Sequence, residues 1–341
     1  MKILLLAGGD SSERSVSIDS GRAIYESLQR LGHKVYAIDP ATGKSLLTSD
    51  GTFVLGETAD NSATAPKKKP STSLLTSTIG SPAFHDIEIV FIALHGGSGE
   101  NGKIQCLLDM AGRGYTGSGM TASAIAMNKD TSKRLCQSEG IDTPDWVMYR
   151  TLGTVDERLF QEICSRFKMP VIVKPNDGGS TIGLSLAKSE AELHDAIDRA
   201  LKESSDLMVE KFVKGREITV SVLDGRPLAL VEIKSSNELY DFEAKYTKGK
   251  SEYISPAEVS EALTKKLQEA AVKIYNVIGA SGLARVDFIL DAKKKFHFLE
   301  LNTLPGMTEL SLAPMAAKAD GIAFDELIGK LLKSAMNKQA S

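Results

Sequence analysis

Two short, almost wholly apolar runs each lead into a glycine-rich loop, and this feature constrains the fold of the first third of the chain. Residues 3–6 precede Gly8-Gly9, and residues 87–94 precede His95-Gly96-Gly97. Runs of this length are typical of strands that are covered on both faces. Because helical segments separate the strands, we predict a parallel sheet in an N-terminal α/β domain that ends near Gly119.

The segment from residue 41 to residue 82 interrupts this pattern. It is rich in serine, threonine and lysine, and Pro66-Lys67-Lys68-Lys69-Pro70 stands at its centre. We predict an exposed insertion here, and we interpret the lysine run as a solvated loop.

The pattern of the chain changes after residue 119. Short strands and helices predict a small α+β unit over residues 120–210. From residue 211 onward two-residue alternation dominates, with a hairpin at 217–233, a long amphipathic helix and a last hairpin at 284–302. The sequence therefore predicts three units, at residues 1–119, 120–210 and 211–341.

Composition excludes several functional classes. The chain has 41 basic and 44 acidic residues, and the formal net charge of −3 provides no basic field for nucleic acid or an anionic membrane. No apolar stretch approaches the roughly 18 residues of a membrane span, and the apolar run at the N-terminus is too short for a signal peptide. The three cysteines are too few for a disulfide framework and favour a reducing compartment. We therefore expect a cytoplasmic protein.

The last hairpin carries the most informative polar pattern. Period-two alternation assigns one face of its two strands to Arg285, Asp287 and Ile289, and to Phe296, Phe298, Glu300 and Asn302. The oxygens of Asp287, Glu300 and Asn302 can then converge, and such hard ligands suit Mg²⁺. The alternative is a salt-bridge ladder across an exposed sheet face.

A further glycine loop, residues 178–183, follows a lysine at the end of a predicted strand, Lys174. The backbone N–H groups of such a loop can close over phosphates while the lysine supplies positive charge. The alternative is a turn that merely needs glycine at positive φ. The Gly-Lys-Ser triplets at 43–45 and 249–251 lack the upstream glycine of a P-loop. The segment 117–119 is a weak dinucleotide-type match, which leaves a nicotinamide-dependent oxidoreductase as another alternative.

Single polar residues also have two interpretations each. Glu13 is either a capping-box residue of the first helix or a carboxylate that receives a substrate ammonium. His95 is either a loop histidine with satisfied hydrogen bonds or a catalytic group. The polar segment that contains Tyr240, Lys245 and Tyr246 predicts a lid over a site.

Seven sequence blocks, in this order, together resemble those of the D-alanine–D-alanine ligases of the ATP-grasp superfamily. The blocks are residues 7–17 (AGGDSSERSVS), 93–102 (ALHGGSGENG), 115–119 (YTGSG), 173–183 (VKPNDGGSTIG), 240–246 (YDFEAKY), 284–287 (ARVD) and 300–308 (ELNTLPGMT). The resemblance covers almost the whole chain. It implies an ATP-grasp fold, with α/β and α+β units, behind an N-terminal parallel-sheet domain.

The resemblance also implies a reaction. Two D-alanine molecules are joined to D-alanyl-D-alanine through an acyl phosphate made with ATP, for peptidoglycan precursor synthesis. The implied cofactors are ATP and two Mg²⁺ or Mn²⁺ ions, and the implied assembly is a homodimer. The alternatives are a ligase that makes D-alanyl-D-serine or D-alanyl-D-lactate, and a binding protein without turnover. Tyr246 favours the dipeptide, because relatives that make D-alanyl-D-lactate tend to carry histidine in the equivalent segment.

The same resemblance implies roles for individual residues. The nucleotide-binding residues are Lys129, Lys174, Glu210, Lys211, Val213, Glu217 and Lys245, and the metal ligands are Asp287, Glu300 and Asn302. The catalytic residues are Glu13, Ser180, Tyr246, Arg285, Gly306 and Ser311. In this scheme Glu13 takes the first ammonium and joins Ser180 and Tyr246 to close the lid. Arg285 and the N–H of Gly306 stabilise an oxyanion, and Ser311 acts with Lys245 on the second carboxylate and the phosphate. Family positions are changed at Gly97, Gly178, Leu304 and Leu310, which affects fine substrate preference.

Overall fold

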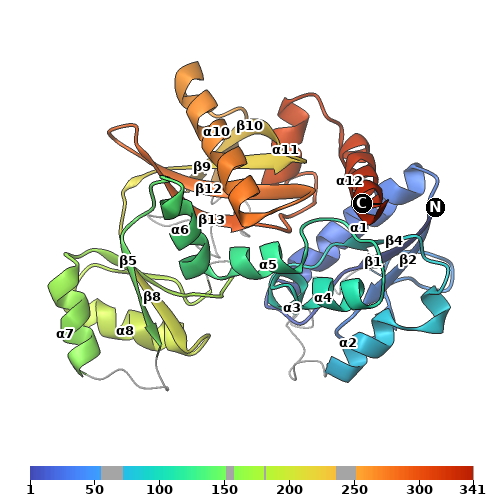
Figure 1. Cartoon of the computed structure of the whole chain (residues 1–341), viewed down its shortest axis with the longest axis horizontal. Coiled ribbons are helices and arrows are strands. Elements are labelled where there is room, and N and C mark those ends of the chain that lie inside the picture. Colours follow the sequence, from blue (N-terminus) through green and yellow to red (C-terminus); the bar gives the residue numbers. More distant parts are fainter. Residues whose placement is uncertain (55–71, 151–156, 180–181, 236–250, 341) are drawn as a thin grey trace.

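The computed structural model describes residues 1–54, 72–150, 157–179, 182–235 and 251–340. Its strands form three sheets, which follow one another in the sequence and occupy separate parts of the molecule in Figure 1. Among the described residues, no helix is both long and apolar enough to cross a lipid bilayer.

The N-terminal sheet has the strand order β3-β2-β1-β4. Its strands are β1 (Lys2–Leu6), β2 (Lys34–Asp39), β3 (Lys44–Ser45) and β4 (Ile89–Ile92). Strand β1 pairs in parallel with both β2 and β4, and only the short β3 is antiparallel. This confirms the parallel sheet that the apolar runs predict.

Helices cover both faces of this sheet. They are α1 (Arg14–Arg30), α2 (Thr72–Ile79), α3 (Gly97–Glu100), α4 (Lys103–Met110) and the last helix α12 (Phe324–Ala340), with a 3₁₀ turn at Pro82–Phe84. Alternate residues of β1 serve the two faces: Ile3 and Leu5 pack in the cluster that contains α1 and α12, and Leu4 and Leu6 pack with α4. Burial on both faces explains why these strands lack polar alternation.

The segment 41–82 is not wholly an exposed insertion, and for its buried residues that prediction is wrong. Leu46, Phe53 and Ile79 are buried, with 8%, 5% and 3% of their surface exposed. Leu46 and Phe53 join one core cluster and Ile79 joins the other, because β3 and α2 extend the edges of the sheet layers. The average polarity of the segment hid these isolated apolar residues. The lysine run lies outside the described residues.

The middle sheet is antiparallel and has the order β5-β8-β6-β7. Its elements are β5 (Trp146–Arg150), β6 (Val171–Pro175), β7 (Ser185–Ala187) and β8 (Asp206–Lys211), with helices α7 (Glu157–Arg166) and α8 (Glu190–Leu201). The two helices share one hydrophobic cluster with the sheet. In Figure 1 this part of the molecule stands apart from the N-terminal sheet.

The third sheet is also antiparallel, in the order β11-β10-β9-β12-β13. Its strands are β9 (Gly215–Leu223), β10 (Arg226–Ser235), β11 (Ser251–Ile254), β12 (Leu283–Asp291) and β13 (Phe296–Asn302). The long helix α10 (Glu261–Ile278) packs on one face, and α11 (Leu312–Ala319) contacts β9 and β10.

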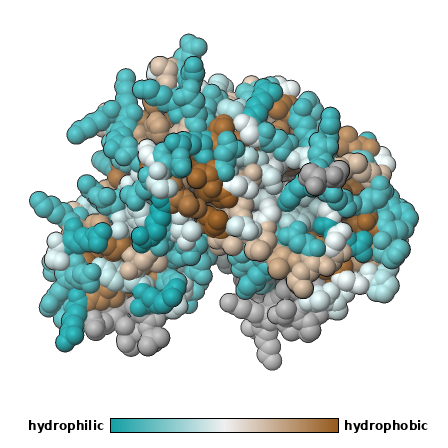
Figure 2. Space-filling model, in the orientation of Figure 1, coloured by the Kyte–Doolittle hydropathy of each residue, from teal (hydrophilic) through white to brown (hydrophobic). Residues whose placement is uncertain are grey.

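Helices α5 (Met120–Met127) and α6 (Lys129–Ser138) belong by packing to the third sheet. Ala122, Ala126 and Cys136 lie in the cluster of β12, β13 and α10, whereas the sequence grouped residues 120–138 with the middle unit. Figure 1 shows both helices beside β13, and Figure 2 shows apolar residues on the surface near the place where they meet α10. Helix α6 thus packs on the third sheet through Cys136 and contacts the middle unit through Lys129.

Candidate active site

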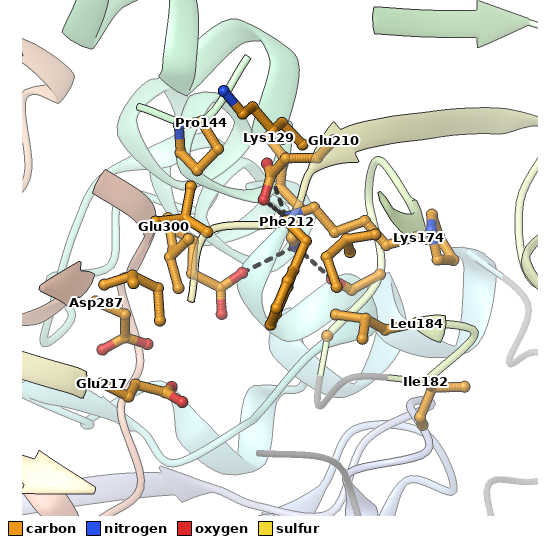
Figure 3. Close-up of a pocket in the computed structure, with 18 of the residues that line it drawn as sticks. Lys129, Pro144, Lys174, Ile182, Leu184, Glu210, Phe212, Glu217, Asp287 and Glu300 are labelled. Carbon is orange, nitrogen blue, oxygen red and sulfur yellow. Dashed lines mark hydrogen bonds and ion pairs between the residues drawn. The ribbon is translucent and has the colours of Figure 1, made fainter. Parts of the chain in front are cut away.

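An open cleft lies between the middle and third sheets. The space between their side chains is about 1020 Å³, including the open solvent at its mouth. Its polar lining residues are Lys129, Lys174, Glu210, Lys211, Glu217, Arg285, Asp287 and Glu300. Figure 3 shows Lys174 and Leu184 on one side of this space and Glu217 and Asp287 on the other. The cleft brings together all of the predicted nucleotide-binding residues that the structure describes, including Val213.

Lysines from two elements hold the inner wall of the cleft. Lys129, at the start of α6, donates a hydrogen bond of 2.7 Å to the carbonyl of Gly178 and forms an ion pair of 3.0 Å with Glu300. Lys174, on β6, pairs with Glu210 on β8, with Nζ 3.2 and 3.3 Å from the two carboxylate oxygens. Lys129 therefore connects the glycine loop of the middle unit with the last hairpin.

A β-bulge in the last hairpin corrects the predicted alternation. Asp287 pairs with Glu300, but Phe288 pairs with Phe298, so β13 holds one extra residue at this place. Phe298 is fully buried with Phe288 on the opposite face, so it does not share a face with Glu300 as the alternation predicted. Leu299 and Glu300 are consecutive, yet both line the cleft. Bulges re-aim side chains in this way beside functional sites.

The predicted metal ligands come from two neighbouring strands. Asp287 lies opposite Glu300, and Arg285 lies opposite Asn302. The Arg285 guanidinium donates two hydrogen bonds of 2.8 Å to the Asp287 carboxylate. Asn302 does not line the cleft, and its Oδ1 accepts a hydrogen bond from the N–H of Leu304 at 3.2 Å.

The donor chemistry of this hairpin fits a magnesium ion. In the described part of the chain no three His, Cys, Asp or Glu residues cluster as a metal site, and the hairpin supplies two carboxylates and one amide. Mg²⁺ usually takes one or two carboxylates and completes its shell with water and phosphate oxygens. Thr219 lies opposite Asp287, and its buried Oγ1 has no hydrogen-bond partner among the described residues. Such an orphaned hydroxyl is expected where water or an ion is bound.

Glu13 lies where two glycine loops meet. It precedes α1 and makes no side-chain capping bond, which removes the capping-box interpretation. A Cβ at Gly96 or at Gly179 would meet the end of the Glu13 side chain, so this carboxylate lies against both loops. Gly96 also has a φ of 62°, which favours glycine. Glu13 therefore reaches from the N-terminal unit to the loop that lines the cleft.

A buried network ties the segment 303–307 to the N-terminal unit. His95 contacts Ser20 Oγ through Nε2 at 2.9 Å, and its Nδ1 lies 2.8 Å from the carbonyl of Leu304. Glu100 accepts hydrogen bonds from the N–H groups of Gly96 and Leu304 at 3.1 and 3.3 Å. Burial lowers the pKa of His95 and raises the pKa of Glu100 to about 7. Both ring nitrogens of His95 thus have hydrogen-bond partners, and Glu100 is a buried carboxylate of this network that the sequence analysis did not single out.

The remaining predicted residues fall into two groups. Ser311 hydrogen-bonds with Thr308, at 3.1 Å from its N–H and 2.8 Å from its hydroxyl, and lies against Gly306, outside the lining of the cleft. Ser180, Lys245 and Tyr246 lie outside the described residues. Nothing in the described structure contradicts or tests their roles.

Comparison with known proteins identifies the family. Residues 2–118 match the model of the D-ala D-ala ligase N-terminus, and residues 135–333 match the model of the D-ala D-ala ligase C-terminus. The chain belongs to the D-alanine–D-alanine ligase family.

Ligases of this family resemble the chain over its full length. It is 39% identical to the D-alanine–D-alanine ligase of Gloeobacter violaceus, covering 99% of this chain and 100% of that protein. It is also 39% identical to the ligase of Aquifex aeolicus, covering 97% and 100%. The crystal structure of the Bacillus anthracis ligase complexed with ATP aligns with a TM-score of 0.77 at 27% identity, covering 100% and 99%. The VanG D-Ala:D-Ser ligase of Enterococcus faecalis aligns with a TM-score of 0.77 at 26% identity, covering 98% and 99%.

Proposed function

We propose that this chain joins two D-alanine molecules to D-alanyl-D-alanine and converts one ATP to ADP and phosphate. Its membership of the ligase family and the ATP complex of a similar structure support the activity and the nucleotide. Within the structure, one observation carries the proposal. Lys129 bridges the glycine loop and Glu300, so phosphate-binding and metal-binding groups face one cleft.

The chemistry explains why this cleft carries charges rather than a covalent nucleophile. A carboxylate is a poor electrophile, so its oxygen first attacks the γ-phosphorus of ATP and ADP leaves. The amine of the second D-alanine then attacks the acyl carbon of the acyl phosphate, loses a proton, and expels phosphate. Phosphoryl transfer depends on positioning and charge neutralisation. In our proposal Lys129 and Lys174 bind phosphates, and Glu210, Lys211, Val213, Glu217 and Lys245 complete the nucleotide site.

Asp287, Glu300 and Asn302 are proposed to hold Mg²⁺ or Mn²⁺. When bound, these ions neutralise charge on the phosphates of ATP. Arg285 is oriented by its two hydrogen bonds with Asp287, and we propose that its guanidinium stabilises the oxyanion.

The substrate residues are proposed on a separate wall. Glu13 takes the ammonium of the first D-alanine, and Ser180 and Tyr246 complete this contact and close the lid. The N–H of Gly306 and the guanidinium of Arg285 stabilise the oxyanion. Ser311 and Lys245 bind the carboxylate of the second D-alanine and the phosphate. A closed lid excludes water, which would hydrolyse the acyl phosphate.

The three units and the assembly are part of the same proposal. The three separate sheets support units at residues 1–119, 120–210 and 211–341, with α5 and α6 packed on the third sheet. A homodimer is what the family implies, and light scattering of the purified protein measures it.

The decisive experiment measures ADP release and identifies the product by mass spectrometry. With ATP, Mg²⁺ and D-alanine we expect D-alanyl-D-alanine and one ADP for each dipeptide. Separate reactions that add D-serine or D-lactate in equal amount test the alternative products. A depsipeptide or D-alanyl-D-serine as the main product would overturn the assignment of the second substrate. Failure to release ADP with any D-amino acid would overturn the activity.

A further inference from the structure

Lys133 is a wholly buried lysine next to the nucleotide cleft, although it does not line the cleft. It lies on α6, one turn after Lys129, and none of its side chain is exposed. Burying an ammonium group is costly unless every proton is bound and the charge is balanced. Hydrophobic packing alone therefore does not explain why a lysine occupies position 133.

The contacts of Lys133 Nζ provide that balance. The ammonium donates to Thr143 Oγ1 at 2.7 Å and to the carbonyl of Pro144 at 3.3 Å, and it forms an ion pair with Glu210. These three acceptors match its three protons. The ring of Trp146 lies beneath it, with its centroid 5.0 Å from Nζ.

Glu210 is shared by two lysines. The same carboxylate binds Lys133 and Lys174, and all three side chains are buried. Burial opposes the charge of Glu210, but Lys133 and then Lys174 outweigh it and hold the pKa of Glu210 below its usual range. A pair of Lys174 and Glu210 alone would be neutral, whereas the cluster with Lys133 has a net charge of about +1.

We propose that Lys133 is a positioning residue for the nucleotide: it neutralises and fixes Glu210, so that the positive charge of Lys174 remains available to the phosphates. The proposal rests on the proposed function, because it concerns the same nucleotide site. Lys133 itself does not touch the nucleotide.

The proposal predicts a pH dependence. Burial lowers the pKa of Lys133 to about 8, partly offset by Glu210, while Lys174 lowers it further. Cys136 on the same helix stays a neutral thiol there, because burial raises its pKa to about 12, and Asp130 and Arg134 flank Trp146. As the pH rises through about 8, Lys133 loses its proton and Glu210 then neutralises Lys174. ATP binding by the native protein is therefore expected to weaken above this pH.

Charge-matched variants test the proposal through the dissociation constant for ATP, measured by calorimetry at pH 7. Lys133→Met leaves Glu210 and Lys174 as a neutral pair, and we expect the dissociation constant to rise about tenfold. The same substitution is then made in a Glu210→Gln background, where no carboxylate is left to neutralise Lys174. Because Glu210 is itself a proposed nucleotide-binding residue, this double variant is compared with Glu210→Gln alone, and we expect the two dissociation constants to agree within about threefold. Lys265→Met, an exposed position on α10, is the matched control and should bind ATP like the native protein.

The single tryptophan supplies a second measurement. Trp146 is the only tryptophan of the chain, and its Nε1 donates to Asp130 at 2.7 Å. We expect its fluorescence to change with an inflection near pH 8 in the native protein. The inflection should be absent in Lys133→Met and in the double variant, and present in Lys265→Met.

The outcomes separate this inference from the proposed function. If the native protein binds no ATP, the proposed function fails and the inference fails with it. If the native protein binds ATP, a native dissociation constant in Lys133→Met overturns the inference alone. If that variant does not fold, a double variant that folds and binds ATP more than tenfold more weakly than Glu210→Gln alone overturns it. A purely structural role would lower thermal stability in both variants, and Lys133→Met would then weaken ATP binding equally in the native and in the Glu210→Gln background.

Discussion

Glu100 is a buried carboxylate that accepts N–H groups from two distant parts of the chain, Gly96 and Leu304. Because burial raises its pKa to about 7, the folded protein binds a proton there that the unfolded chain releases at lower pH. The contribution of this group to stability is therefore complete below the ordinary carboxyl pKa and is lost as the pH rises through about 7.

We expect Glu100→Gln to remove this pH dependence. Relative to the native protein, the free energy of unfolding of the variant should increase between pH 5 and pH 8 by an amount on the order of 3 kcal/mol. Urea unfolding at several pH values measures the difference. Glu26→Gln, at an exposed position on α1, should give no such trend. If the free energy of unfolding changes with pH in the same way in Glu100→Gln and in the native protein, the raised pKa of Glu100 is contradicted.

Asp287 is held by Arg285 and faces Glu300, and we propose that it binds a metal ion. We expect Asp287→Asn to reduce D-alanine-dependent ADP release by about 100-fold or more, because the lost charge is needed in the transition state. A chelator should stop the native enzyme, and excess Mg²⁺ should restore it but not the variant. Asp291→Asn, at the outer end of the same strand, is the control. Unchanged turnover in Asp287→Asn would refute the metal site.

At the scale of elements, the bulge in β13 decides what faces the cleft. It lets Leu299 and Glu300 both point to one side, while Leu301 returns to the core of the third sheet with 3% of its surface exposed. A regular strand would place neighbouring residues on opposite faces. The bulge thus adds the apolar side chain of Leu299 to the lining of the cleft without removing the carboxylate of Glu300.

Two neighbouring leucines test this geometry. Leu299→Ala is expected to raise the KM for ATP severalfold with little loss of stability, because its side chain lines the cleft. Leu301→Ala is expected to lower the free energy of unfolding by about 2–5 kcal/mol with an unchanged KM. Steady-state kinetics and urea unfolding of both variants provide the measurement. If the two substitutions change the KM for ATP and the free energy of unfolding by equal amounts, the bulge does not place Leu299 in the cleft and Leu301 in the core.

At the scale of the whole molecule, the end of the chain returns to its beginning. Helix α12 packs on the N-terminal sheet, and Leu327, Ile328 and Leu331 share a cluster with Ile3 and α1. Residues of β10 and α11 join the same cluster, so the N-terminal and third sheets have a continuous hydrophobic core. The middle unit has a hydrophobic cluster of its own, and Figure 1 shows this unit apart from the N-terminal sheet.

The Arg30–Asp325 pair joins α1 and α12 at the surface, with two hydrogen bonds of 2.9 and 2.7 Å. Arg30 lowers the pKa of Asp325 to about 2, so the stabilisation is present above the ordinary carboxyl pKa and is lost as the pH falls toward 2. Because both groups are partly exposed, we expect Asp325→Asn to cost only about 0.2–1 kcal/mol at pH 7. Unfolding measurements from pH 7 down to pH 3 should show this difference shrinking. Asp320→Asn is the control, and a difference that grows toward low pH would contradict the pairing.

Local patterns in the sequence were sufficient for much of the fold and for part of the site. The apolar runs of β1 and β4 predict a parallel sheet, because a strand covered on both faces cannot alternate. The alternation of the last hairpin placed Asp287 and Glu300 on neighbouring strands, because side-chain direction has a period of two. These features depend on residues that are close in the chain.

Tertiary structure alone decided the rest. The bulge that separates Phe298 from Glu300 depends on pairing between strands, and the core position of Leu46 and Phe53 depends on packing against α1 and β1. The cluster of Lys133, Glu210 and Lys174 joins α6, β8 and β6, which lie far apart in sequence. No local pattern marks such contacts, because burial and charge balance are properties of groups that meet only when the chain is folded.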